Sequence, residues 1–380
     1  MKKYLLLFCL PLFFSCGEKG SSETREPDNI LENLTFTIDT VVTNSGEDIF
    51  NLTMGIRSLD LSLDKKTLFY FENLPPKLLQ VDLESKKLLE KKTFEVEGPN
   101  GIGSFVAKIE VGPDGKLFLM GNTGLGIFEE SGTMLQNLKI EPEGIDFELA
   151  KNFFSLYGNS FYDWENQKIY TWPRDEGSET LGLISIDVQT KTAKIIDTPE
   201  MEIVKKYSIQ SEDNGSFQVS AQRVYLSKHD GKILIACSAI GNLYEYDPQT
   251  ENLKFIEINH QLIPNRLTGE VTNQLHSSRD FLKEMANINS QIMYQDLKWD
   301  SSRDLFLRIA MKVLPSNIPD EPTKYDYYLL AYDQNFNLLG ESKLELRDRI
   351  DSSFFWKDGK LYSYVNVEDE LGFAVFTFNF

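Results

Sequence analysis

One short unit recurs six times along this chain of 380 residues, and it constrains the fold more than any other feature. Each copy has a strand-like run, a tight turn rich in Asp, Asn, Gly or Ser, and a second run that opens with apolar residues. Turns such as 113–115 (PDG) and 229–231 (HDG) are strong signals of a β-hairpin. The second runs begin at Leu68, Leu117, Ile169, Ile233, Leu305 and Leu361.

A second hairpin follows the first in five of the six copies. These second hairpins begin at Leu78, Gly126, Ile184, Leu243 and Leu329. Four strands per copy, at intervals of roughly 50–70 residues, predict an all-β fold of the β-propeller type with six four-stranded blades. One blade cannot bury both of its faces alone, so neighbouring blades are expected to stack around an axis.

The sixth copy ends one strand early, and the opposite end of the chain offers a replacement. The last run is Phe376–Phe380, whereas Leu34–Val41 alternates apolar and polar residues with the period of a strand. Pairing the two segments would close the ring and cover two exposed strand edges. The alternatives are an open sandwich or two smaller barrels.

The first residues have the pattern of a bacterial lipoprotein signal. Lys2 and Lys3 precede an apolar run, Tyr4–Phe14, which is shorter than the ~20 residues of a membrane-spanning helix. The run ends at Ser15-Cys16, which resembles a lipobox and predicts lipidation of Cys16. We therefore expect a signal peptide at 1–15, a flexible tether at 16–33 and the propeller at 34–380. The alternative is an ordinary cleaved signal peptide followed by a stray cysteine.

The net charge and the cysteine content argue against a nucleic-acid partner and against an internal disulfide. The net charge of −19 argues against a nucleic-acid partner. Of the three cysteines, Cys9 would leave with the signal peptide and Cys16 would carry lipid, so the mature chain would hold no internal disulfide. The remaining cysteine, Cys237, lies in an apolar run and reads as a small hydrophobic residue.

Motifs of catalysis and metal binding are missing from the sequence. The three histidines are scattered, and the chain has no HExxH, CxxC, GxSxG or DxDxDG pattern. We therefore assign no catalytic residue, no metal ligand and no cofactor. Paired carboxylates for glycoside chemistry remain possible, because a sequence does not give their separation.

Propeller topology predicts which face carries function. The strands of each blade are named A to D from the axis outwards. The A–B and C–D turns are short and share one face, the turn face; the other connections share the insertion face. The long segments 140–159, 198–215 and 259–291 belong to the insertion face, with helices expected at 145–156 and 279–288. Many acidic residues also map there and could hold a divalent cation such as calcium or steer a basic partner, or could simply be solvated surface.

The lipobox, the six copies and the loop Glu97–Gly103 (EGPNGIG) together resemble a family of bacterial lipoproteins, the domain of unknown function 4221. The resemblance implies a fold similar to six-bladed TolB-like propellers. It brings no activity or catalytic residues to this chain.

The candidate binding residues are Arg57, Glu97 and Asn100. Arg57 precedes the first inner strand and the 97–103 loop precedes the second, so we expect all three near the axial mouth on the insertion face. A buried arginine there would need a carboxylate or a bound anion as its partner. The structural alternative is an Arg57–Glu97 pair that merely ties two blades together.

The functional expectation is a lipid-anchored, non-enzymatic module of the cell envelope that binds a small ligand or an envelope protein. Its place would be the outer membrane, with the body facing either the periplasm or the surface. The alternative is an envelope hydrolase or lyase acting on glycan or lactone substrates in the axial pocket.

Overall fold

The computed structural model describes residues 29–141, 144–145, 155–174, 182–213, 215–315, 321–346 and 349–380. The predicted signal peptide, Cys16, most of the tether and most of the expected helix at 145–156 lie outside these residues. No helix within the described ranges is long and apolar enough to cross a membrane.

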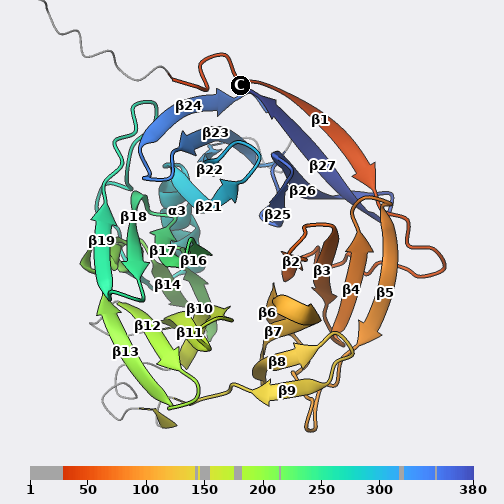
Figure 1. The fold of residues 1–380 in the computed structure, drawn as a ribbon. Coiled ribbons are helices and arrows are strands. Elements are labelled where there is room, and N and C mark those ends of the chain that lie inside the picture. Colours follow the sequence, from red (N-terminus) through yellow and green to blue (C-terminus); the bar gives the residue numbers. More distant parts are fainter. Residues whose placement is uncertain are drawn as a thin grey trace, which may run out of the picture.

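The described residues form six four-stranded antiparallel sheets, arranged around a central axis as in a propeller (Figure 1). Each sheet is given from its inner to its outer strand. Sheet 1 is β2 (Leu59–Leu61), β3 (Thr67–Glu72), β4 (Lys77–Asp82) and β5 (Lys87–Thr93). Sheet 2 is β6 (Val106–Val111), β7 (Lys116–Gly121), β8 (Leu125–Glu129) and β9 (Met134–Asn137). Sheet 3 is β10 (Ser155–Asp163), β11 (Lys168–Arg174), β12 (Gly182–Asp187) and β13 (Thr192–Asp197).

The second half of the chain repeats this order. Sheet 4 is β16 (Val224–His229), β17 (Lys232–Cys237), β18 (Ile240–Asp247) and β19 (Asn252–Ile256). Sheet 5 is β21 (Met293–Asp300), β22 (Leu305–Leu314), β23 (Lys324–Tyr332) and β24 (Leu338–Leu344). Sheet 6 is β25 (Phe354–Lys357), β26 (Lys360–Val367), β27 (Glu370–Asn379) and β1 (Thr35–Val42). All six predicted second runs begin within one residue of the strand that the structure has there.

The hydrophobic core is divided into six clusters, and each cluster lies between two neighbouring sheets. Alternate residues of one strand serve two clusters. In β3, Phe69 and Phe71 pack towards sheet 2, whereas Leu68 and Tyr70 pack towards sheet 6, where they meet Phe373. The last sheet is therefore packed against the first.

The N-terminal strand is the outermost strand of sheet 6, as predicted. β1 pairs antiparallel with β27 from Thr35 opposite Asn379 to Val42 opposite Gly372. The residues just before it differ from the expectation of a tether that stays flexible to residue 33. Leu31 is fully buried in the cluster between sheets 5 and 6. The folded body therefore starts earlier, by residue 29.

Two insertions contain structure of their own. The 198–215 insertion forms the short helices η3 (Pro199–Met201) and α2 (Glu202–Lys206) and the strand β14 (Ile209–Asp213). β14 lies between β15 (Ser216–Ser220) and β20 (Gln274–Leu275) in a small sheet that the sequence did not predict. The predicted helix at 279–288 is α3 (Ser278–Asn289), and only part of its apolar surface is buried. Phe281 and Ile288 are buried, whereas Leu282 is 53% exposed.

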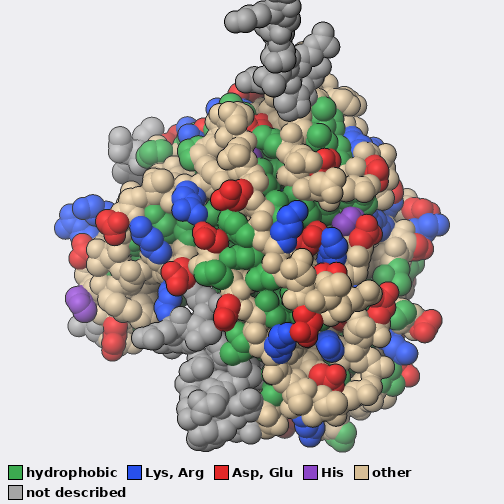
Figure 2. All heavy atoms as spheres, turned by 60° about the vertical axis from the view of Figure 1, so that its left-hand side comes forward, with side chains coloured by type: hydrophobic (Ala, Val, Ile, Leu, Met, Phe, Trp, Pro, Cys, Tyr) green, Lys and Arg blue, Asp and Glu red, His purple; other side chains and the backbone are tan. Residues whose placement is uncertain are grey.

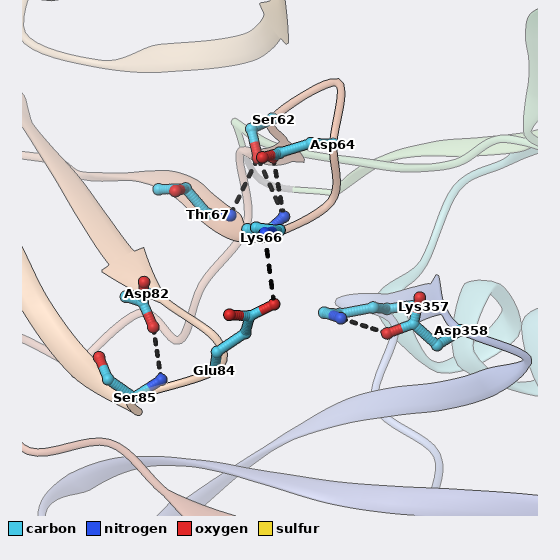
Figure 3. A network of polar contacts seen from close by, with 9 residues as sticks. All are labelled: Ser62, Asp64, Lys66, Thr67, Asp82, Glu84, Ser85, Lys357 and Asp358. Atoms are coloured by element: carbon cyan, nitrogen blue, oxygen red, sulfur yellow. Dashed lines mark hydrogen bonds and ion pairs between the residues drawn. The ribbon is translucent and has the colours of Figure 1, made fainter.

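Hydrogen bonds to short polar side chains close the tight turns of the turn face (Figure 3). In sheet 1 the Asp64 carboxylate accepts bonds from the Ser62 hydroxyl (2.6 Å) and the Lys66 backbone N–H (3.1 Å). The next turn repeats the motif at Asp82, whose carboxylate accepts the backbone N–H of Ser85. These bonds hold the pKa of both aspartates below the usual range. The Asp and Ser residues of the repeat therefore have a local structural role.

A buried polar network joins the outer parts of sheets 4 and 5 through His260. Asn265 Nδ2 donates to Asn242 Oδ1 (2.8 Å), which leaves Asn265 Oδ1 to accept a bond from His260 Nδ1 (2.6 Å). His260 Nε2 then accepts the hydroxyl bond of Tyr332 (2.8 Å). The ring is neutral in this arrangement, and burial lowers the pKa of His260 to about 4.

Deleting residues 35–42 should lower the melting temperature of the whole chain by several degrees. The deletion exposes the edge of β27 and removes the apolar cover that Phe36 gives to Phe376 and Phe378. For large domains each 1 kcal/mol of lost stability lowers the melting temperature by about 2–4 °C. Circular dichroism melting measures the effect, with Thr37→Ala on the exposed side of the same strand as control. A deletion variant that melts like the full chain would contradict the integral role of β1.

Protonation of His260 should make stability depend on pH. Between its unfolded pKa of about 6.5 and its folded pKa of about 4, the unfolded chain binds a proton that the folded chain excludes. The free energy of unfolding should therefore fall as the pH drops through this window, by at most about 1.4 kcal/mol per pH unit. Urea unfolding of wild type and His260→Gln at several pH values tests this. The variant should show a shallower decline, and equal slopes would contradict the assignment.

Candidate ligand-binding site

The three residues predicted for the binding site do not meet in the structure. Arg57 is exposed just before β2, and its Nε donates to the Met54 carbonyl (3.2 Å). Asn100 Oδ1 accepts the backbone N–H of Met134 (3.0 Å), which begins β9. Asn100 therefore lies at the outermost strand of sheet 2, and the exposed Glu97 is on the same loop. Within the described residues no ion pair joins Arg57 to Glu97.

The distance of the 97–103 loop from the propeller axis explains why the three residues do not meet. The 97–103 loop starts from the outer strand β5 and crosses the sheet interface before it reaches the inner strand β6, so its first residues are still at the periphery. Arg57 does line a small cavity with Glu72 and Asn73, but the volume is only ≈ 20 Å³. Glu72 is already paired with Lys91 at 2.9 Å. This cavity has room for about one water and no larger ligand.

A larger cavity of ≈ 250 Å³ opens on the insertion face between sheets 4, 5 and 6. Its walls come from the connection that enters β16, the end of β17, the starts of β21 and β23, β22, and the connection that enters β25. The polar residues that line it are Ser220, Gln222, Arg223, Tyr225, Ser238, Asn289, Gln295, Tyr325, Tyr327, Arg349, Asp351 and Ser352. The cavity lies on the face where the sequence predicted a site, but Arg57, Glu97 and Asn100 are not among its lining residues.

The cavity is locally basic in an acidic protein. Among the described residues, Arg223 and Arg349 line it together with a single carboxylate, Asp351. The Arg349 guanidinium lies 5.5 Å from the centre of the Tyr325 ring. The Tyr325 ring stacks in turn on Tyr327, at 5.7 Å between ring centres. An aromatic face below a guanidinium stabilises the cation and orients its donors.

Hydrogen bonds hold the cavity walls in place. The Tyr327 hydroxyl donates to the Ile350 carbonyl (3.3 Å) and accepts the Ile350 backbone N–H (3.1 Å), which fixes the connection that bears Arg349. Opposite, the Ser238 hydroxyl accepts the backbone N–H of Arg223 (2.9 Å). Burial raises the pKa of Tyr327 to about 12, so this phenol stays protonated at neutral pH.

The fully buried Arg308 supports the inner strand β21 through hydrogen bonds. A bulge interrupts β21 between Tyr294 and Leu297, and the Arg308 Nε donates to the Gln295 carbonyl there (2.6 Å). Its two other nitrogens donate to the carbonyls of Gly241 (2.7 Å) and Cys237 (3.0 Å) in sheet 4. The side chain of Gln295 lines the cavity and accepts a bond from Tyr225 (3.3 Å). A lone arginine in the apolar run of β22 is a sequence signal of such a role.

Closer to the turn face, the inner strands carry an ionic cluster. Its members are Asp60, Lys108, Glu110, Asp296 and Lys298. Lys108 pairs with Glu110 (3.1 Å), and Lys298 pairs with Asp296 (2.7 Å). Burial raises the pKa of Glu110 and of Asp60. Each of these two carboxylates nevertheless accepts a backbone N–H from the next inner strand.

Those bonds give the cluster a structural role. Asp60 accepts from Val111 (2.8 Å), and Glu110 accepts from Tyr162 (2.9 Å), so the carboxylates join sheets 1, 2 and 3. None of the cluster residues lines the large cavity.

The described surface shows no metal centre. No group of three or more His, Cys, Asp or Glu side chains in the described ranges is placed to hold a metal ion. On the flank of sheets 3 and 4, acidic and basic side chains are interspersed (Figure 2). Some of the acidic residues expected on the insertion face, including Glu143 and Asp175, lie outside the described residues. The calcium alternative stays a prediction.

Two solved structures share the fold at low sequence identity. A crystal structure of a DUF4221 family member from Bacteroides vulgatus has a TM-score of 0.65 at 15% identity, over 91% of this chain and 98% of that one. A putative exported protein from Bacteroides fragilis has a TM-score of 0.50 at 8% identity, over 90% and 95%. An oligogalacturonate lyase in complex with manganese has a TM-score of 0.44 at 9% identity, over 90% and 96%.

The comparison with curated proteins gives no match. The family model described as a domain of unknown function, DUF4221, matches residues 27–343, which is most of the chain. This protein therefore belongs to the DUF4221 family.

Proposed function

We propose that this protein is a lipid-anchored binding module of the bacterial cell envelope, whose ligand site is the large cavity of the insertion face. One observation carries the proposal: a cavity of ≈ 250 Å³ is lined by three sheets and contains two arginines without an ion-pair partner among the described residues. Concave sites with a few converging polar groups are the usual places for small ligands.

The scaffold in this proposal is a closed propeller of six blades. Six four-stranded sheets, six inter-sheet clusters and the pairing of β1 with β27 support it. A closed ring is rigid, and it keeps the cavity walls at constant separation although they come from residues far apart in the chain.

The residues that line the cavity fit a binding function better than the reaction of a hydrolase or a lyase. Of its described lining residues, the one carboxylate, Asp351, accepts the backbone N–H of Ser353 (2.8 Å), and none is a histidine or a cysteine. The carboxylates with raised pKa, Asp60 and Glu110, lie outside it and bond to backbone. A general acid must be within hydrogen-bond reach of the substrate, and these two are placed for structure instead.

Attachment to the envelope rests on the first residues. Lys2, Lys3, the apolar run to Phe14 and the Ser15-Cys16 pair support a lipid anchor in the outer membrane. The similar structure from Bacteroides fragilis is described as a putative exported protein, which is compatible with this location. A diacylglyceryl group with an amide-linked chain would supply the two hydrophobic anchors that stable attachment needs.

Cys16→Ala should abolish lipid attachment. The alanine variant has no thiol to receive a diacylglyceryl group, so it should be released from membrane fractions or accumulate as the precursor. Metabolic labelling with a clickable fatty acid measures attachment, with Cys237→Ala as the matched control that keeps its label. Label on the Cys16→Ala protein would remove Cys16 as the anchor site.

Filling the cavity should abolish small-molecule binding. Ala221 lines the cavity at an exposed position, so Ala221→Trp should block the site with little effect on melting. The full chain, purified in detergent, is incubated with a small-molecule extract of bacterial envelopes, and retained compounds are identified by mass spectrometry. Ser85→Trp, on an exposed turn of the opposite face, is the control and should retain what the wild type retains.

Two results would contradict the proposed function. The first is a wild-type chain that retains no small molecule from the extract. The second is an Ala221→Trp variant that retains the same compounds as the wild type.

A further inference from the structure

We infer that the ligand of the large cavity is a ring compound the size of one sugar unit that carries a single carboxylate. This inference rests on the proposed function and adds the chemical class of the ligand. The charge, the hydrogen-bonding groups and the size of the cavity support it.

The charge of the cavity matches one negative charge on the ligand. Two arginines and one aspartate give the described residues of its lining a formal charge of +1, although the whole chain carries −19. A carboxylate of charge −1 neutralises that excess. A phosphate monoester carries about −1.5 to −2 at pH 7 and would leave negative charge uncompensated in the cavity.

The two guanidinium groups are free to bind an anion. Arg303 and Arg266 in the same half of the chain pair with Asp300 (2.6 Å) and Glu200 (3.7 Å). Arg223 and Arg349 have no such partner in the described part of the chain, although the sequence offers 58 acidic residues. A guanidinium binds a carboxylate through two parallel hydrogen bonds, which is why arginine is common at such sites.

The other lining groups suit a ring with hydroxyl groups. Tyr225 and Gln295 present a phenol and an amide that already bond to each other (3.3 Å), and Ser220 and Ser352 add two hydroxyls. These groups can donate and accept, as sugar hydroxyls require. The Tyr325 ring also lines the cavity and adds apolar surface to its wall.

The size of the cavity sets the upper limit of the ligand. A volume of ≈ 250 Å³ equals the space of about eight water molecules. This is enough for one six-membered sugar ring with a carboxylate, and a second ring would extend into solvent at the mouth.

The test compares three probes on the full chain in detergent: glucuronate, glucose and glucose 6-phosphate. Isothermal titration calorimetry at about 0.15 M salt keeps long-range surface electrostatics screened. We expect glucuronate to bind at least about tenfold more tightly than either of the other two, a difference of about 1.4 kcal/mol. Arg349→Gln and Arg223→Gln should each weaken glucuronate binding by about tenfold or more. Arg266→Gln, a substitution of an exposed arginine that does not line the cavity, should bind glucuronate like the wild type.

Several results would overturn the inference. Equal affinity for glucose and glucuronate, or normal glucuronate binding by both cavity variants, would remove the carboxylate from the recognition. Tighter binding of glucose 6-phosphate would replace it with a phosphate. If none of the three probes binds while Ala221→Trp still loses compounds retained from the extract, the ligand class is wrong and the proposed function stands. If Ala221→Trp loses nothing, the proposed function itself fails.

Discussion

The packing of each sheet against both neighbours is the interaction on which the structure depends. A strand with alternate side chains in two different cores has no free face, and β3 illustrates this: Phe69 and Phe71 serve one cluster, Leu68 and Tyr70 another. The same rule applied to six sheets leaves only the outer strands and the two ends of the axis to solvent. Function has to reside at one of these places, and the turn face is occupied by short turns closed by their own side chains.

Polar residues between the sheets mark the points where strand geometry is irregular. Arg308 occupies an inward position of β22 where an apolar residue would otherwise pack, and it donates to carbonyls at bulges in β21 and at the end of β17. Leaving a buried carbonyl without a hydrogen bond costs about 1–3 kcal/mol of stability. One long side chain with several donors satisfies several of these carbonyls at once. Gln295, whose carbonyl accepts one of these bonds, also lines the cavity with its side chain. The arginine that supports the bulge is therefore bonded directly to a residue of the site.

The sequence predicted the strands much better than the site, for a physical reason. Strand position follows from local patterns, so the second runs at Leu117 and Ile233 and the closing strand at 35–42 were all found. A site depends on radial distance from the axis, which no local pattern encodes. Asn100 was placed on the correct face but lies at the outer strand β9. Arg223 and Arg349 are far apart in the chain, and neither has neighbours that distinguish it from a surface arginine.

The walls of the cavity combine connecting segments with residues of the strands, and this arrangement can give ligand selectivity. The cations come from segments outside the strands, whereas the groups that hold those segments, Tyr327 and Ser238, belong to strand β23 and to the turn between β17 and β18. A substitution in a connecting segment would change the ligand chemistry without disturbing the inter-sheet packing. A guanidinium held over Tyr325 loses less rotational freedom on binding than a free one, so more of its interaction energy becomes affinity. The same fold can thus present different chemistry at one mouth while its stability depends on residues elsewhere.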